Sequence, residues 1–157
     1  MKNLSLFCLL LACIGLQSCK NDSKPNDAKV QAEKPISVSC YQALYEKDTI
    51  DLKMNTLKDG KITGNMVMKI LDMPEKIGEI TGEFRGDTLF VDYSFIQGTN
   101  EKRTFKNPMA MLKRGDTLIL GNGEIETYLG RSYFAKGKPI DFDSVKYKFT
   151  SVDCVDK

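Results

Sequence analysis

The 157-residue sequence contains no histidine. Histidine is the commonest general base, a member of the serine and cysteine catalytic triads, and a usual ligand of zinc and haem. Carboxylates remain as acid–base candidates, and we consider Asp92, Glu124 and Glu126, although no motif marks them. The Asp-Phe-Asp at 141–143 is a weak cation-binding candidate, because a lone Asp-x-Asp is common. We therefore expect a protein that is not an enzyme and that has no metal or cofactor.

The sequence also lacks a long basic run and any patch of interleaved aromatic residues. Its formal net charge is only +2 at pH 7. Proteins that bind nucleic acids need clustered lysine and arginine to neutralise phosphates. We therefore expect no nucleic-acid partner.

The apolar segment near the start, Leu4–Leu16, is too short for a transmembrane helix, which needs about 20 residues. It follows Lys2 and precedes small and polar residues, an order that is typical of a secretory signal peptide. The next four letters, "LQSC" at 16–19, resemble the lipobox of bacterial lipoproteins, whose cysteine receives diacylglycerol. The sequence thus predicts a lipoprotein signal peptide over 1–18 and a lipidated Cys19.

Two alternatives to lipidation at Cys19 stay open. Cleavage before Cys13, after "LLA", would leave apolar residues exposed, whereas the chain becomes polar only from Lys20. Ordinary secretion would leave Cys19 as a plain thiol. Lipidation implies firm membrane anchoring, because each buried CH₂ contributes about 0.8 kcal/mol. By analogy with enteric lipoproteins, Lys20 after the cysteine favours the outer membrane, on its periplasmic or its surface face.

Composition divides the rest of the chain into two parts. Residues 19–36 are rich in charge and proline and have few apolar side chains, which predicts a flexible polar tether. Residues 37–157 are then a single domain with its own core.

Only two of the five cysteines belong to that domain. Cys8 and Cys13 leave with the signal peptide, and Cys19 is acylated. Cys40 and Cys154 stand near the two ends of the domain, and export to an oxidising compartment favours a disulfide between them. Two unpaired thiols are the alternative. A disulfide would require the first and last strands to lie side by side.

Apolar and polar residues alternate in five segments, and none shows a sustained helical period. Turn residues separate the segments at intervals of roughly ten residues. This pattern predicts an all-β fold, an antiparallel β-meander of about eight strands that closes into a small barrel or a curved half-barrel. A two-sheet β-sandwich is the alternative. The residues predicted to face inward are Ile50, Leu52, Met54, Ile62, Gly64, Met66, Met68, Ile70, Gly78, Ile80, Gly82, Phe84, Leu89, Val91, Tyr93, Phe95, Val145, Tyr147 and Phe149.

The tetrapeptide "RGDT" occurs twice, at 85–88 and at 114–117. Arg-Gly-Asp on an exposed loop is known as an adhesion ligand, but both copies lie between alternating segments. Gly-Asp suits a two-residue hairpin loop, where glycine adopts a positive φ at low steric cost. The repeat therefore predicts two hairpins, with Leu89 and Leu118 as the first inward residues of the strands that follow.

Several of these segments together resemble a group of uncharacterised envelope lipoproteins of Bacteroidota, especially flavobacteria. The resemblance covers about Cys40–Phe134, and its most specific part is "GDTLFVDYSF" at 86–95. It includes the Cys-Tyr pair at 40–41 and the Gly-x-Gly at 121–123. The resemblance implies no particular activity. A fainter likeness is to small periplasmic barrels that inhibit lysozyme, whose Ser-Gly-rich inhibitory loop is not evident here.

Two functions fit a monomeric, lipid-anchored barrel. The first is binding of a small apolar ligand inside the barrel, where glycines would leave space and methionines would adapt to irregular shapes. The second is a protein- or glycan-interaction or inhibitor module that uses the outer surface. The ligand-lining candidates are Met54, Gly64, Met66, Met68, Gly82 and Tyr93. The outward contact candidates are Tyr41, Tyr45, Phe90, Ile96 and Tyr128.

Overall fold

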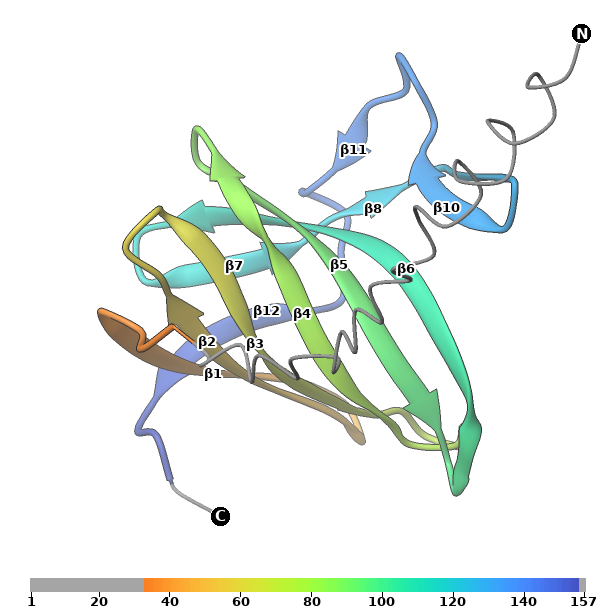
Figure 1. Cartoon of the computed structure of the whole chain (residues 1–157), viewed down its shortest axis with the longest axis horizontal. Coiled ribbons are helices and arrows are strands. Elements are labelled where there is room, and N and C mark those ends of the chain that lie inside the picture. The colour runs from red at the N-terminus through yellow and green to blue at the C-terminus, as the bar shows by residue number, and fades with distance from the viewer. Residues whose placement is uncertain (1–32, 156–157) are drawn as a thin grey trace, which may run out of the picture. The chain divides into compact units, whose positions relative to one another are not determined.

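The structure, a computed structural model, describes residues 33–155 of the chain. Within that range it contains β-strands and no helix, hence none that could cross a membrane (Figure 1). The barrel strands are β1 (Ser37–Tyr45), β2 (Asp48–Thr56), β3 (Lys61–Lys69), β4 (Lys76–Arg85), β5 (Thr88–Gln97), β6 (Asn100–Arg114), β7 (Thr117–Leu120) and β12 (Lys148–Val152). The remaining strands are β8 (Asn122–Gly123), β9 (Ile125–Tyr128), β10 (Arg131–Phe134) and β11 (Ile140–Asp141).

Eight antiparallel strands close into a barrel in the order β1-β12-β7-β6-β5-β4-β3-β2. Strands β1 to β7 follow one another as a meander, and β12 closes the ring between β7 and β1. The prediction of a closed barrel is confirmed, and the two-sheet sandwich is not the fold. Between β7 and β12 the chain leaves the barrel and forms two small sheets, β9–β10 and β8–β11.

Side chains fill the interior of the barrel. The predicted alternation places the inward residues of β2 to β5 in one core, and Ile50, Met66 and Leu89 are fully buried. Phe149 of β12 and Met111 of β6 complete this core from the other side of the barrel. An eight-stranded barrel is just wide enough for its side chains to fill it. The interior is therefore a packed core and not a chamber.

The predicted outward orientation of Tyr41 and Tyr45 is wrong. Pairing of β1 with β2 sets Tyr41 opposite Leu52 and Tyr45 opposite Asp48, on the inner side of the wall. Tyr41 packs against the core, and the Tyr45 ring meets Tyr147 edge to face at 6.1 Å. The inner positions of β1 include serines as well as tyrosines and an alanine, so its alternation alone did not identify the buried face.

The two Gly-Asp loops have the predicted hairpin conformation. Gly86 has φ +61° between β4 and β5, and Gly115 has φ +59° between β6 and β7. Leu89 and Leu118 are the first buried residues of the strands that follow. Because hairpin loops alternate between the ends of a meander, both loops lie at the same end of the barrel. The repeated tripeptide is thus a repeated turn.

The inward glycines Gly64 and Gly82 have a different role from the one expected. A Cβ at Gly64 would collide with the Lys53 carbonyl group, and one at Gly82 with the Phe90 carbonyl group. Gly78 is in the same situation against Ser94. These glycines do not leave space in the barrel; they let neighbouring backbones approach where the sheet coils tightly.

Strand β6 is the longest, and it continues through Pro108. The Lys113 N–H donates to the Asp87 carbonyl, which precedes β5, and the Ala110 carbonyl accepts the N–H of Gly121, which follows β7. The backbone groups of odd-numbered β6 residues therefore face β5, and those of even-numbered residues face the β7 side. The pairing with β7 covers only the last four residues of β6. Pro108 therefore falls where no N–H is required, which is the position that proline tolerates in a sheet.

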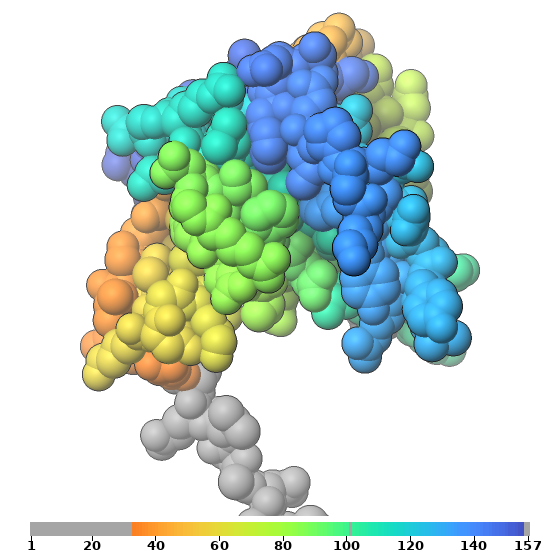
Figure 2. Space-filling model, turned by 90° about the horizontal axis from the view of Figure 1, so that it is seen from above, coloured from red at the N-terminus to blue at the C-terminus, as the bar shows by residue number. Residues whose placement is uncertain are grey.

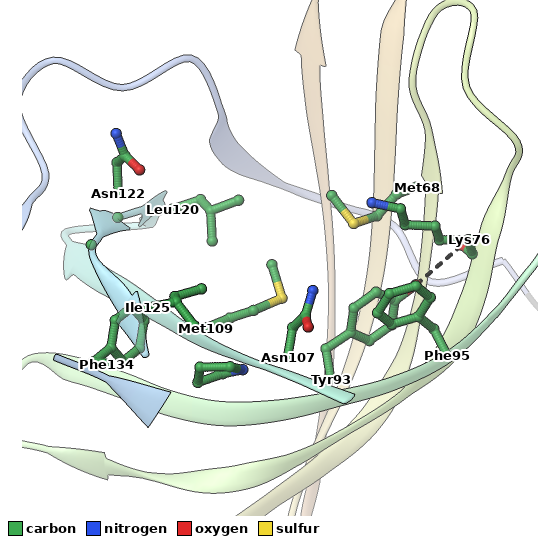
Figure 3. A pocket seen from close by; sticks show the side chains of 13 residues that line it. Met68, Lys76, Tyr93, Phe95, Asn107, Met109, Leu120, Asn122, Ile125 and Phe134 are labelled. Carbon is green, nitrogen blue, oxygen red and sulfur yellow. Dashed lines mark hydrogen bonds between the residues drawn. The ribbon is translucent and has the colours of Figure 1, made fainter. Parts of the chain in front are cut away.

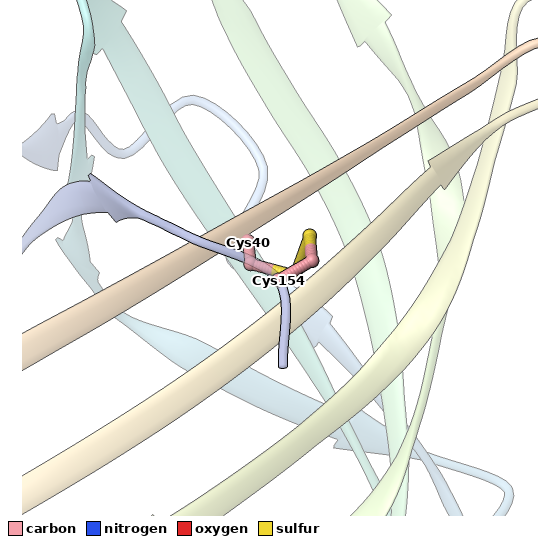
Figure 4. The surroundings of a disulfide bond; sticks show 2 residues. All are labelled: Cys40 and Cys154. Atoms are coloured by element: carbon pink, nitrogen blue, oxygen red, sulfur yellow. A yellow bond between two sulfur atoms is a disulfide. The ribbon is translucent and has the colours of Figure 1, made fainter. Parts of the chain in front are cut away.

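A disulfide joins Cys40 and Cys154, as predicted (Figure 4). Their Cα atoms are 5.2 Å apart although 114 positions separate them in sequence. Cys40 lies opposite Val152 in the β1–β12 pair, so the bond links the two strands at which the barrel closes.

Candidate functional site

The first hollow, here called the mouth pocket, has a volume of about 190 Å³ and lies beside the part of β6 that does not pair with β7 (Figure 3). It forms because β7 ends at Leu120 and β8 no longer pairs with β6. Its lining residues are Met68, Lys76, Tyr93, Phe95, Asn107, Pro108, Met109, Leu120, Gly121, Asn122, Gly123, Ile125 and Phe134. Apolar side chains predominate, from both the barrel interior and the excursion between β7 and β12.

Tyr93 forms the inner end of the mouth pocket. Its ring stacks on Phe95, with centroids 4.7 Å apart, and Phe95 stacks on Phe105 at 5.5 Å. The Tyr93 hydroxyl lies 3.0 Å from the Met66 carbonyl oxygen and 3.1 Å from that of Lys76, and its single hydrogen is shared between these two acceptors. Burial raises the pKa of Tyr93, so the hydroxyl stays protonated and remains a donor. The aromatic wall is therefore held in one position.

Lys76 supplies the single charged side chain among the residues that line the mouth pocket. Its Nζ lies 5.4 Å from the centroid of the Phe95 ring. Within residues 33–155 it forms no ion pair with a carboxylate. An ammonium group thus lies on an aromatic ring at the edge of an apolar pocket, and no carboxylate of the described residues pairs with it.

Two glycines shape the outer wall of the mouth pocket. A Cβ at Gly123 would lie 2.8 Å from the Phe134 ring, and one at Gly121 would lie 2.5 Å from the Phe142 ring and 2.6 Å from Ile140. Side chains at these positions would displace the rings. The Gly-x-Gly of the sequence is therefore a packing feature, which places Phe134 against the pocket.

The second hollow, here called the outer groove, has a volume of about 540 Å³ and lies outside the barrel. The outward faces of β4, β5 and β6 form one side of it, and strand β10 forms the other. Its lining residues are Lys61, Thr81, Gly82, Glu83, Arg85, Phe90, Val91, Asp92, Pro108, Met109, Ser132, Tyr133 and Phe134. This groove mixes charged, hydroxyl and aromatic side chains.

The structure separates the six predicted ligand-lining residues. Met68 and Tyr93 line the mouth pocket, and Gly82 borders the outer groove. Met54 and Met66 lie in the filled core, and Gly64 makes the close backbone contact described above. Sequence reasoning missed Lys76 and Phe134. The alternation that places Gly78 inward also places Lys76 inward, so that signal was present, whereas nothing local indicated where Phe134 packs.

Of the candidate catalytic carboxylates, Asp92 borders the outer groove, whereas Glu124 and Glu126 line neither hollow. Asp92 pairs with Lys106 at 2.7 Å, and Glu124 pairs with Lys138 at 3.7 Å on the excursion. Asp141 accepts the N–H groups of Asp143 and Ser144, so the Asp-Phe-Asp segment is a turn. These bonds lower the pKa of Asp141. Among residues 33–155 no three Cys, Asp or Glu side chains come together in a way that could hold a metal ion.

Of the outward contact candidates, Phe90 borders the outer groove, whereas Tyr128 is 71% exposed near the end of the β9–β10 hairpin and borders neither hollow.

The predicted signal peptide, Cys19 and most of the tether lie outside the described residues. Comparisons of the chain with protein-family models, with curated proteins and with solved structures each found no match. The resemblance to Bacteroidota envelope lipoproteins stays a prediction.

Proposed function

We propose that this protein is a non-catalytic binding protein that holds a small apolar acid in its mouth pocket. The observation that carries the proposal is the Lys76 ammonium group at the edge of an apolar pocket, with no carboxylate partner within residues 33–155. A carboxylate on the ligand would supply that partner, while the apolar part of the ligand would pack on Phe95, Met68 and Met109.

The size of the mouth pocket limits the ligand. Sites for drug-sized molecules usually measure about 300–1,000 Å³. A pocket of about 190 Å³ is smaller. Since a water molecule takes about 30 Å³ of liquid, the pocket accommodates about six non-hydrogen atoms, while the ligand's carboxylate oxygens would stay at its edge beside Lys76. It therefore fits a short-chain acid, or the end of a longer amphiphile whose remainder stays in solvent.

Its shape and wall chemistry also favour binding over catalysis. Tyr93 is held by two backbone acceptors and by ring stacking, so it presents a rigid surface. Met68 and Met109 also line the pocket, and their flexible side chains adapt to different ligand shapes. No acid–base pair faces the hollow, because Lys76 is the single charged side chain in its lining.

The test compares hexanoate with 1-hexanol by isothermal titration calorimetry on the exported protein and on Lys76→Met. The substitution keeps an apolar side chain and removes the charge. We expect hexanoate to bind the wild type, and to bind Lys76→Met about fivefold more weakly. A fivefold change in affinity corresponds to a loss of about 1 kcal/mol of binding free energy, as for an exposed ion pair. The affinity for 1-hexanol should change little.

The matched control is Lys58→Met, which removes an exposed lysine at the other end of the barrel. It should leave both affinities unchanged. Equal loss of hexanoate binding in both lysine variants, or no binding of either compound, would contradict the proposal. Native mass spectrometry of the exported protein complements the titration, because a discrete extra mass that disappears on denaturation would identify a natural ligand.

The location belongs to the same proposal. We propose a monomeric envelope lipoprotein, lipidated at Cys19 and most consistent with the outer membrane. The cysteine ends a segment with the order of a lipoprotein signal, and about seventeen residues, most of them polar, would separate the lipid from the barrel. Metabolic labelling with an alkyne fatty acid tests it: label should enter the wild type and be absent from Cys19→Ala.

A further inference from the structure

A long excursion of the chain, residues 121–147, lies between β7 and β12 and is not needed to close the barrel. Strands β7 and β12 already pair directly, with Leu118 opposite Phe149. Long connections in compact domains usually carry a function. Here the excursion folds into the β9–β10 hairpin, whose following residue Ala135 is almost fully buried. The ordered hairpin makes one side of the outer groove.

The hairpin is held against the barrel by aromatic packing. Phe134 of β10 meets the outward Phe90 of β5 edge to face, with ring centroids 6.5 Å apart. Beneath this contact Ala110 of β6 is completely buried, although it points away from the barrel interior. In Figure 2 the blue hairpin segment stands beside the green β4–β5 segment, and the outer groove lies between them.

The charged groups along the groove are already paired within the protein. Arg85 bonds Glu83 at 3.0 Å, and Asp92 bonds Lys106 at 2.7 Å. Lys61 bonds a neighbouring aspartate at 2.8 Å. These side chains are between 45% and 67% exposed, so their remaining donor and acceptor positions face the solvent. The groove thus offers fixed hydrogen-bonding groups of both kinds without an excess of either charge.

Aromatic surface lies next to these polar groups. Arg85 covers one side of the Phe90 ring, with its Cζ 5.3 Å from the centroid. Tyr133 borders the groove and remains 48% exposed. The faces of aromatic rings carry partial negative charge and attract the partially positive C–H groups of an apolar surface. Tyr133 therefore provides a stacking surface beside a row of hydrogen-bonding groups.

We propose that the outer groove binds a short neutral oligosaccharide, with a sugar ring on Tyr133 and hydroxyl groups on Asp92, Glu83 and Arg85. Every sugar hydroxyl both donates and accepts, which matches neighbouring groups of both kinds. The groove volume of about 540 Å³ falls within the usual range of ligand sites, about 300–1,000 Å³.

Two other occupants fit less well. An extended peptide that adds a strand needs an unpaired strand edge. At the floor of the groove β4 and β5 are paired on both sides, and the unpaired part of β6 that borders it contains Pro108, which has no N–H to donate. A purely apolar ligand would lie on charged side chains and remove their water, which costs free energy. A neutral saccharide avoids both problems.

The experiment is a ¹H–¹⁵N NMR titration of the exported protein with maltotriose, cellotriose, mannotriose and N-acetylchitotriose. We expect at least one trisaccharide to shift amide signals of β10 and of the outward-facing part of β4 and β5. Tyr133→Ala should weaken that binding about tenfold or more. Tyr128→Ala is the matched control, because Tyr128 belongs to the same hairpin and does not border the groove.

Binding that is unchanged in Tyr133→Ala, or equally weakened in Tyr128→Ala, would overturn the assignment. Absence of any shift with all four trisaccharides at millimolar concentration would overturn it as well, and shifts produced instead by a peptide would assign the groove to a protein partner. Lys76→Met should leave saccharide binding unchanged, so this test is independent of the ligand proposed for the mouth pocket.

Discussion

Two tyrosine hydroxyl groups connect parts of the barrel that are distant in sequence. The Tyr93 hydroxyl on β5 donates to carbonyl oxygens of β3 and β4. The Tyr147 hydroxyl, just before β12, donates to Oδ2 of Asp48 at the start of β2, at 2.6 Å. Burial and the bond to Asp48 raise the pKa of Tyr147 to about 12, so the phenol stays protonated and donates. These two side chains thus provide hydrogen bonds that join separate strands near the mouth pocket.

Asp48 should make the stability of the fold depend on acid pH. The Tyr147 hydroxyl, and after it the Leu71 N–H, lower the pKa of Asp48 below the ordinary value of 3.8. A carboxyl group whose pKa is lower in the folded state stabilises the fold above the unfolded pKa, and this contribution is lost as pH falls through the folded pKa. We expect Asp48→Asn to lose less stability than the wild type as pH falls below about 4.

Urea denaturation of both proteins at neutral pH and at about pH 3 measures this difference. Asp116→Asn is the control, since it removes an exposed carboxylate in the β6–β7 loop and should show the same acid dependence as the wild type. An Asp48→Asn variant that loses as much stability in acid as the wild type would contradict the role of this carboxylate.

Within single strands and hairpins, glycines of this protein follow two separate rules. In the loops, Gly86 and Gly115 adopt positive φ and have no atom near the position of a Cβ. In the strands, Gly82 and Gly64 have no positive φ, but a neighbouring carbonyl group occupies the position of a Cβ. The loop positions require glycine because of their backbone conformation, and the strand positions require it because a larger side chain would collide with the next strand.

Replacement by alanine should separate these two kinds of glycine. Gly86→Ala should reduce the free energy of unfolding by about 1–2 kcal/mol, the cost of a left-handed conformation. Gly82→Ala should cost about 3 kcal/mol, because the Phe90 backbone must move. Urea denaturation gives both values, and Gly86→Asn should be milder than Gly86→Ala because asparagine adopts this conformation more readily. Equal costs for the two alanine variants would argue against the close strand contact.

The whole molecule depends on closure between its first and last strands. β1 pairs with β12 over the four residues Cys40–Ala43, and β12 pairs with the four-residue β7 at only two positions. By contrast, β4 and β5 pair over ten positions. The two pairings of β12 are thus among the shortest in the ring, and the disulfide lies across one of them, the pairing of β1 with β12.

Removal of the disulfide should therefore destabilise the fold strongly. A loop of more than a hundred residues corresponds to about 4–5 kcal/mol in the chain-entropy model, which is an upper value. We expect Cys40→Ser combined with Cys154→Ser to approach that loss in urea denaturation, and reduction of the wild type to give the same result. If reductant leaves the free energy of unfolding of the wild type unchanged, the stabilising role of the disulfide is contradicted.

Local pattern by itself determined a large part of this fold. Alternation identified the buried faces of β2 to β5, because both neighbours of each strand adjoin it in sequence. Gly-Asp identified two hairpins, because a positive φ is a property of the residue itself. The pairing of Cys40 with Cys154 was predicted from the expected export and from the count of cysteines, and it agreed with a barrel that closes between its first and last strands.

Only the tertiary structure decided where the hollows lie. The buried face of β1 depends on its register with β2, and the course of β6 through Pro108 depends on where β7 ends. The mouth pocket and the outer groove both require Phe134, on an excursion whose packing partner Phe90 is 44 positions away. Short-range periodicity carries no information about such contacts, because they depend on which distant surfaces meet once the barrel has closed.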